Sequence, residues 1–261
     1  MKNRVIAVIL SIFTILTFCG CDRREERVYP EPKGVLVIGS DEYEPYNYMN
    51  NNGEYIGIDV DIAREACRRM GYTAEFKKIK WNEKNRYLED GTVDCIWGCF
   101  TMNGREDDYL WAGPYLHSNQ VVIVRASSDI YKLKDLEGKM VAIQSSTKPE
   151  QIFLQREDEK IPKVKKLYCF ASTSEAVAAF KKGYVDACAG HELALQVLIR
   201  SSDEAYRILD ESLMKADLGV AFLKNHDPEV VEKLNEVLKE MQADGTISSI
   251  LQEYNADSGK R

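Results

Sequence analysis

Arg105 closes the stretch GCFTMNGR (residues 98–105), and the local sequence offers it no obvious partner. A strand-like run, VDCIW, leads into this stretch, and the acids at 106–108 come next along the chain, where they would point elsewhere. A guanidinium is planar and can bind a carboxylate through two parallel hydrogen bonds. Arg105 therefore suits a ligand carboxylate, and a salt bridge to a nearby surface acid is the alternative.

A second polar group that could meet an anion lies at residues 146 and 147. The sequence Thr147-Lys-Pro-Glu150 predicts the start of a helix, with Thr147 as N-cap and Glu150 three residues later. Free backbone N–H groups and the dipole of a helix N-terminus favour a negative charge. Thr147 could also do no more than cap its helix, and the two roles are compatible.

Strands and helices must position these residues, and they alternate in two blocks. In the first block we expect strands at 35–39, 74–80 and 93–98, with helices around 63–70 and 82–89. In the second we expect strands at 140–143, 165–170 and 185–190, with helices opening at 147 and at the capping box 172–175. A last helix is expected over 227–245. Two such blocks predict an α/β fold with two open sheets, whose ligands bind beyond the carboxyl ends of the strands.

The N-terminal segment predicts export. A basic start precedes a mostly apolar run at 5–18, which is too short to span a bilayer comfortably. Gly20 directly before Cys21 resembles a bacterial lipoprotein signal. We therefore expect 1–20 to be removed as a signal peptide, Cys21 to carry lipid, and 21–33 to form a tether. An ordinary secretory signal cut nearby is the alternative.

The composition excludes several classes of partner and cofactor. The formal charge is −7, and loss of Lys2 and Arg4 with the signal peptide makes it −9, so no nucleic-acid partner is expected. Five of the seven cysteines follow Cys21, an odd number without metal-ligand spacing, so we expect neither a disulfide scaffold nor a metal site. The chain lacks GxxxxGK[ST], and we expect no cofactor.

The stretch GIDVDIAREACRRM (57–70) resembles the signature of the bacterial extracellular solute-binding proteins of the polar amino-acid type, family 3. The likeness continues through WAGPY (111–115), GKMVAIQSST (138–147), KKGYVDACAG (181–190) and MQADGT (241–246). It implies a two-lobe periplasmic-binding-protein-like fold of type II, with two open sheets joined by two crossing strands. Lobe 1 would comprise 34–117 and 219–258, and lobe 2 would comprise 118–218. Such proteins close on a small ligand, which an ABC transporter then imports.

The resemblance also implies how the ligand carboxylate is held. Arg105 matches the arginine that grips it from the first lobe. Ser146 and Thr147 match a hydroxyl pair that meets it from the second lobe. A carboxylate bound from both sides would hold the two lobes together.

Four further residues match positions around the rest of the ligand. Tyr43 and Trp81 match the two aromatic residues on either side of the ligand side chain, where flat rings bury apolar area. Gly98 and Phe100 belong to a turn that usually meets the ligand, and Phe100 stands where a hydroxyl side chain is common. The aromatic residues could instead be part of the core.

His191 departs from the family pattern. The resemblance places an aspartate at this position, where it receives the α-amino group of the ligand. A neutral histidine could accept one hydrogen bond, and a protonated one would repel an ammonium. The ligand is therefore either an amino acid held differently or a carboxylate without a free α-amine. Asp41, Glu42 or Glu44 could also bind an amine.

We expect a monomeric extracytoplasmic lipoprotein, anchored to the membrane by lipid, that captures a small amino acid or related carboxylate for an ABC transporter permease. An alternative is a ligand-binding sensor module that contacts a membrane receptor. A cyclohexadienyl-dehydratase-like enzyme, with His191 as acid or base, is a further alternative. Because no catalytic constellation stands out, we do not expect an enzyme.

Overall fold

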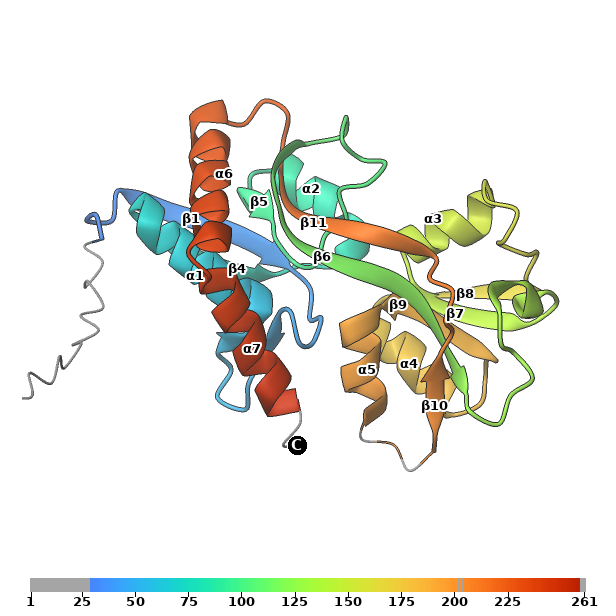
Figure 1. Ribbon diagram of the computed structural model, residues 1–261. Helices are drawn as coiled ribbons and strands as arrows, with labels where there is room; N and C mark the ends of the chain where they lie inside the picture. The colour runs from blue at the N-terminus through green and yellow to red at the C-terminus, as the bar shows by residue number, and fades with distance from the viewer. Residues whose placement is uncertain (1–28, 201, 203, 259–261) are drawn as a thin grey trace, which may run out of the picture.

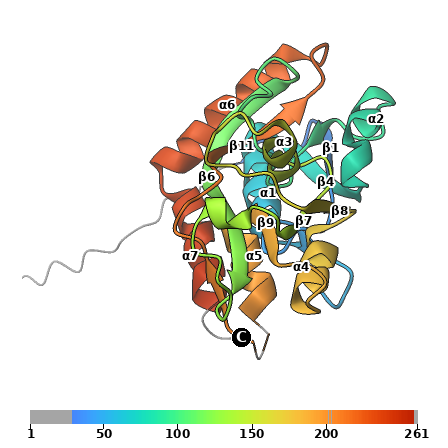
Figure 2. The same cartoon turned by 90° about the vertical axis from the view of Figure 1, so that its right-hand side faces the viewer.

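The computed structural model of the chain describes residues 29–200, 202 and 204–258. The expected signal peptide, Cys21 and most of the tether lie outside these residues. Two groups of helices and strands stand side by side, and the two long strands β6 (Leu110–Arg125) and β11 (Met214–Phe222) run from one group to the other (Figure 1). Viewed from its right-hand side, the second group stands in front of α1 of the first (Figure 2).

The first lobe contains the beginning and the end of the described chain. Its strands are β1 (Gly34–Ser40), β2 (Tyr48–Met49), β3 (Tyr55–Ile56), β4 (Tyr72–Lys78) and β5 (Cys95–Ile96). Its helices are α1 (Ile58–Met70), the short η1 (Trp81–Glu83), α2 (Lys84–Glu89), α6 (Pro228–Ala243) and α7 (Thr246–Ser258). Strand β1 pairs in parallel with β4 on one side and β5 on the other. The apolar face of α1 packs with α6 over this sheet, as the expected 3.6-residue spacing requires.

The second lobe repeats the alternation of strands and helices. Its strands are β7 (Met140–Gln144), β8 (Lys166–Phe170), β9 (Ala187–His191) and β10 (Tyr206–Ile208). Its helices are η2 (Leu133–Leu136), α3 (Lys148–Gln155), α4 (Thr173–Lys181) and α5 (Glu192–Arg200). Strand β7 pairs in parallel with β8 and β9. Separate apolar clusters on its two faces bury Ile143 and Ala142, so this sheet is covered on both sides.

The two expected sheets are hydrogen-bonded into one. The strand order is β4-β1-β5-β11-β6-β9-β7-β8, with β10 pairing β6, because the crossing strands pair with each other and with strands of both lobes. The two open sheets expected from the sequence are therefore the two halves of one continuous, curled sheet. The crossing strands β6 and β11 form the connection that the family resemblance implies.

Most expected elements are present, and two expectations are wrong in detail. The strand expected at 93–98 is only the two-residue β5, and just before it the Val37 N–H donates to the Asp94 side chain at 2.7 Å. The capping box expected at Ser172 and Glu175 is confirmed. At α3, Thr147 is the N-cap, but its hydroxyl donates to the Gln144 carbonyl 2.6 Å away and does not cap the helix.

Candidate functional site

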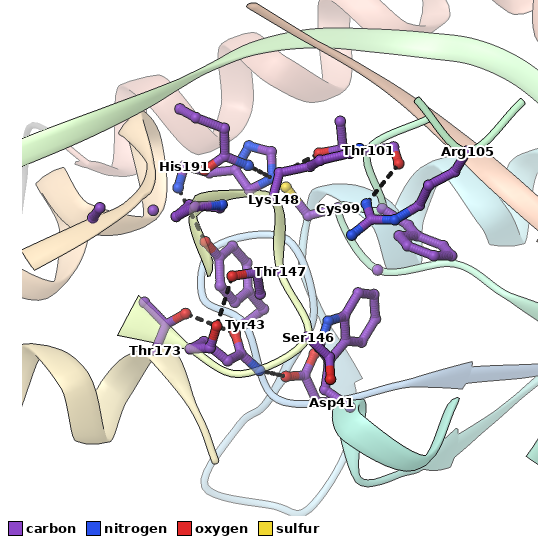
Figure 3. Close-up of a pocket in the computed structure, with 18 residues that line it drawn as sticks. Asp41, Tyr43, Cys99, Thr101, Arg105, Ser146, Thr147, Lys148, Thr173 and His191 are labelled. Atoms are coloured by element: carbon purple, nitrogen blue, oxygen red, sulfur yellow. Dashed lines mark hydrogen bonds between the residues drawn. The ribbon is translucent and has the colours of Figure 1, made fainter. Parts of the chain in front are cut away.

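A cleft lies between the two lobes, and residues of both lobes line it (Figure 3). All eight residues predicted to bind ligand line it: Tyr43, Trp81, Gly98, Phe100, Arg105, Ser146, Thr147 and His191. The other lining residues are Asp41, Cys99, Thr101, Gln120, Gln144, Lys148, Pro149, Thr173, Ala189 and Gly190. The structure thus brings the predicted residues together, and their contact with a ligand stays a prediction.

Arg105 reaches the cleft from the loop between β5 and β6. Its guanidinium donates to the Thr101 carbonyl at 3.1 Å, and its central carbon lies 5.2 Å from the centre of the Phe100 ring. The Arg105 carbonyl accepts a hydrogen bond from the indole of Trp111, which fixes the loop. Among the described residues no carboxylate lies within ion-pair distance of this guanidinium, so the surface salt bridge considered from the sequence is absent.

The turn before Arg105 is fixed from behind by a buried carboxylate. Asp59, at the start of α1, accepts hydrogen bonds from the Cys99 N–H at 2.6 Å and from the Tyr115 hydroxyl at 2.9 Å. Cys99 has φ +51°, a left-handed conformation that costs free energy in a residue other than glycine. Gly98 has no room for a side chain, since a Cβ there would lie 2.2 Å from the Ser40 hydroxyl. The signature stretch 57–70 therefore helps to shape the cleft.

Two aromatic side chains form walls of the cleft. Tyr43 accepts a hydrogen bond from the His191 N–H at 3.2 Å, so it joins the first lobe to the second. Trp81 stands edge-on to Phe100, with ring centres 5.1 Å apart, and its indole N–H is buried without an acceptor among the described residues. Tyr46 does not line the cleft and packs in the core of the first lobe.

The start of α3 brings the second lobe to the cleft. Ser146 has φ +60° and its N–H donates to Glu150 at 2.7 Å. The Glu150 carboxylate therefore accepts from the N–H of Ser146, the residue before the N-cap. The sequence led us to expect that Glu150 would pair with Thr147 instead, so this expectation is wrong. Because the Thr147 hydroxyl is used on the Gln144 carbonyl, this side chain has less freedom to meet a ligand than the sequence suggests.

His191 is buried and engaged on all sides. Its Nδ1 lies 3.1 Å from the Ser118 hydroxyl, and its Nε2 lies 2.7 Å from the amide nitrogen of Gln120. Burial, together with the charge of Arg105, lowers the pKa of His191 to about 3, so the ring is neutral at pH 7. A proton on Nδ1 satisfies both contacts, and the Oε1 of Gln120 is then left without a partner among the described residues.

Several charged and polar residues that line the cleft were not among the eight predicted ligand-binding residues, although Asp41 was considered as an amine partner. Asp41 accepts a hydrogen bond from the Gln144 amide across the cleft, and burial raises its pKa to about 6. Its position directly after β1 was a usable signal, because ligands gather at the carboxyl ends of such strands. Lys148 is 6 % exposed and lies beside the predicted Thr147. Gln120, in the middle of β6, carries no such signal.

Of the three acids considered as amine partners, only Asp41 lines the cleft. Glu42 pairs with Lys78 on the surface at 2.9 Å. The five described cysteines are free, and four are buried while Cys169 is exposed. In the described part of the chain no group of three or more His, Cys, Asp or Glu could hold a metal ion.

Residues 35–257 match the family of bacterial extracellular solute-binding proteins, family 3. The chain belongs to this family. The L-cystine-binding protein TcyA of Bacillus subtilis (strain 168) is 29% identical over 226 residues, which cover 85% of this chain and 81% of TcyA. The two-lobe α/β fold expected from the sequence is thereby confirmed, and the relatives of this solute-binding protein are amino-acid-binding proteins of extracellular or periplasmic location.

Solved structures give the same picture. An ancestral arginine-binding protein bound to arginine is 27% identical, with a TM-score of 0.75, over 85% of this chain and 97% of that chain. The ancestral amino acid-binding protein AncCDT-1, a precursor of cyclohexadienyl dehydratase, is 25% identical with a TM-score of 0.74, over 85% of this chain and 95% of that chain.

No helix within the described residues of this solute-binding protein is long and apolar enough to cross a membrane.

Proposed function

We propose that this solute-binding protein captures a small amino acid or related carboxylate outside the cytoplasm and delivers it to an ABC transporter. The supporting observation is Arg105, a half-buried guanidinium at the cleft with no carboxylate partner in the described structure. Buried charges in proteins are normally paired, so the site calls for an anion from outside. The family and the names of the relatives support the same role.

The contacts across the cleft support a closing mechanism. Tyr43 meets the His191 N–H, and Asp41 meets the Gln144 amide, so each lobe contributes groups to the same small space. We propose lobe boundaries at 34–117 with 219–258 and at 118–218, so that the crossing strands carry the hinge. A ligand that touches both lobes stabilises the closed state by its differential affinity for that state.

The anchor and the partner rest on the sequence and the family. We propose that Cys21 carries lipid, that the monomeric protein stays at the outer face of the cell membrane, and that an ABC transporter permease receives the ligand. Incorporation of labelled fatty acid into the wild type, and its loss in Cys21→Ser, tests the anchor. A sensor module would share the same cleft, and an adjacent permease gene favours transport.

A catalytic role for His191 has less support. An imidazole whose pKa is lowered to about 3, and whose two ring nitrogens are both engaged, is a weak base at pH 7. Catalytic turnover of prephenate or arogenate by the purified protein would contradict the proposal of a binding protein.

The carboxylate role of Arg105 gives a direct test. Arg105→Ala should weaken binding of the cognate amino acid or carboxylate at least tenfold, because one or two charged hydrogen bonds contribute about 1.5–3 kcal/mol each. Isothermal titration calorimetry measures the change. Arg64→Ala, which removes an exposed arginine on α1, should leave affinity unchanged. Equal affinity for wild type and Arg105→Ala would remove Arg105 from the site.

A further inference from the structure

Three positively charged side chains gather where the two lobes meet, and each is held by neutral groups alone. Besides Arg105, these are Lys148, which is 6 % exposed, and Lys84, which is 7 % exposed. Arg105 and Lys148 line the cleft, and Lys84 lies beside it, in contact with the carbonyl of the lining residue Ser146. The Lys148 amine donates across the cleft to the Gly104 carbonyl at 3.4 Å, and the Lys84 amine donates across it to the Ser146 carbonyl at 3.3 Å. In the described structure none of the three cations has a carboxylate within ion-pair distance. A buried cation in such surroundings is costly until an anion joins it.

Lys148 occupies a place that disfavours a cation. It is the first residue of α3, where the unpaired N–H groups and the helix dipole repel positive charge. Its amine also contacts the Gln151 amide at 2.8 Å, which is a neutral partner. Burial and the nearby charge of Arg105 both lower the pKa of Lys148. A bound anion would relieve the repulsion between the two cations and pair with the helix N-terminus as well.

Two lining side chains hold polar atoms that lack partners. The indole N–H of Trp81 is buried without an acceptor among the described residues, and the Lys84 amine lies 4.9 Å from the centre of the Trp81 ring. The N–H therefore fits an acceptor oxygen of the ligand, and Lys84 adds positive charge near the same ring. The Oε1 of Gln120, beside His191, is the corresponding unpartnered acceptor and fits an amine or hydroxyl. A ligand that satisfies both atoms carries acidic groups and a donor.

The charge balance of the cleft stays positive after its own acids are counted. Asp41 is buried and Glu150 is half-buried, and Glu150 is used on the Ser146 N–H. Glu106, Asp108 and Glu157 also act on Lys148, but all three are exposed and therefore screened by water. Arg105 and Lys148 thus line the cleft against one lining carboxylate, Asp41, and the charges of Lys84 and Glu150 beside the cleft offset each other. A zwitterion leaves this excess of one positive charge in place, while a ligand with one more negative charge removes it.

We propose that the cleft selects small carboxylates with net negative charge, such as an amino acid with a second acidic group, and that Lys148 is the specificity residue that binds the ligand anion together with Arg105. The inference rests on the proposed solute-binding function and narrows its ligand class. It differs from the amino acids named for the relatives, since cystine has no net charge and arginine is cationic at pH 7.

Pairs of ligands that match in shape and differ by one charge test the inference. Calorimetry and thermal shift at pH 7 compare glutamate with glutamine, aspartate with asparagine, and succinate with its monoamide, with arginine and cystine alongside. The acid of at least one pair should bind at least tenfold more tightly than its amide. Lys148→Met should reduce this preference to about threefold or less, and Lys148→Arg should keep it. Lys166→Met, which removes an exposed second-lobe lysine, is the matched control and should keep it as well.

The outcomes of this experiment distinguish a failure of the charge selection from a failure of the proposed solute-binding function. Tighter binding of a neutral or cationic amino acid, with binding lost in Arg105→Ala, overturns the charge selection and leaves the solute-binding function intact. The same preference in Lys148→Met and wild type overturns the role of Lys148. Absence of binding by every acid of the panel overturns the charge selection, and absence of binding by any carboxylate or amino acid at all counts against the proposed function too.

Discussion

Arg105 can face the cleft unpaired because neighbouring residues hold its loop without neutralising it. The Trp111 indole binds its carbonyl, and the Thr101 carbonyl accepts from its guanidinium. The strained turn at Cys99, which precedes Arg105, is fixed by Asp59, because the Asp59 carboxylate accepts a hydrogen bond from the Cys99 N–H. Each of these contacts leaves the guanidinium charge available, so the residue that binds and the residues that position it are distinct.

Asp59 should therefore matter more as a positioning residue than as a charge. Asp59→Ala leaves the buried Cys99 N–H and Tyr115 hydroxyl without their acceptor, and we expect the free energy of unfolding to fall by about 2 kcal/mol or more. Asp59→Asn should retain most of the stability, because an amide can accept from the N–H and donate to the hydroxyl oxygen. Urea unfolding measures both. Asp129→Ala, at an exposed site, is the control, and equal losses in Asp59→Ala and Asp59→Asn would contradict this account.

The residues predicted from the sequence share one property, which is that each matches a local pattern. Arg105, Trp81 and Thr147 belong to short stretches that resemble a family, and all three line the cleft. Lys148 and Gln120 were missed because their importance comes from burial and missing partners. Those properties depend on which distant segments fold over them, and a single sequence does not display that.

At the scale of elements, the cleft exists because strand ends from two lobes point at each other. The end of β1 supplies Asp41 and the end of β7 supplies Gln144, and these two side chains meet across the cleft. The alternation of strands and helices predicted this meeting of carboxyl ends. It did not predict one continuous sheet, because the pairing of β6 with β9 and β10 joins residues that are far apart in sequence.

The contact between β1 and β7 should contribute to closure. Gln144→Leu removes the amide donor of Asp41 and leaves this buried carboxyl without its partner from the second lobe. The closed state then becomes less populated, and apparent ligand affinity should fall by about tenfold, the equivalent of one charged hydrogen bond. Calorimetry gives the affinity, and small-angle scattering should show a larger radius of gyration at equal ligand concentration. Gln196→Leu on α5 is the control, and unchanged affinity in Gln144→Leu would exclude this contact from closure.

At the scale of the whole molecule, an acidic chain surrounds a cleft rich in cations. The full sequence carries a formal charge of −7, while Arg105, Lys148 and Lys84 gather at the junction of the lobes. The composition alone predicted an acidic protein without a nucleic-acid partner. It gave no sign that positive side chains collect where the two lobes meet. Net charge describes the surface as seen from a distance, whereas ligand choice depends on the few charged groups that water cannot reach.

The buried titratable groups also act on the stability of the whole fold, and their effects oppose each other. Burial raises the pKa of Asp41 to about 6 and the pKa of Asp59 to about 7. Between about pH 7 and pH 4 the folded protein therefore keeps protons that the unfolded chain releases. The free energy of unfolding rises through this effect as the pH falls over that range. Burial and Arg105 lower the pKa of His191 to about 3 from an ordinary 6.5, so the unfolded chain takes up a proton that the folded protein refuses. This effect destabilises the fold as pH falls from about 6.5 to about 3.

His191→Gln isolates the histidine effect, because the carboxyl effects are common to both proteins. Between about pH 6 and pH 4, the free energy of unfolding of the wild type should fall relative to that of the variant by about 1.4 kcal/mol for each pH unit, the value for one proton. Urea unfolding at several pH values provides the comparison. A difference between the two proteins that does not change with pH would mean that the folded protein binds a proton at His191 as readily as the unfolded chain does. The ring could then carry a charge in the cleft, and the positive excess that selects the ligand would grow in acid.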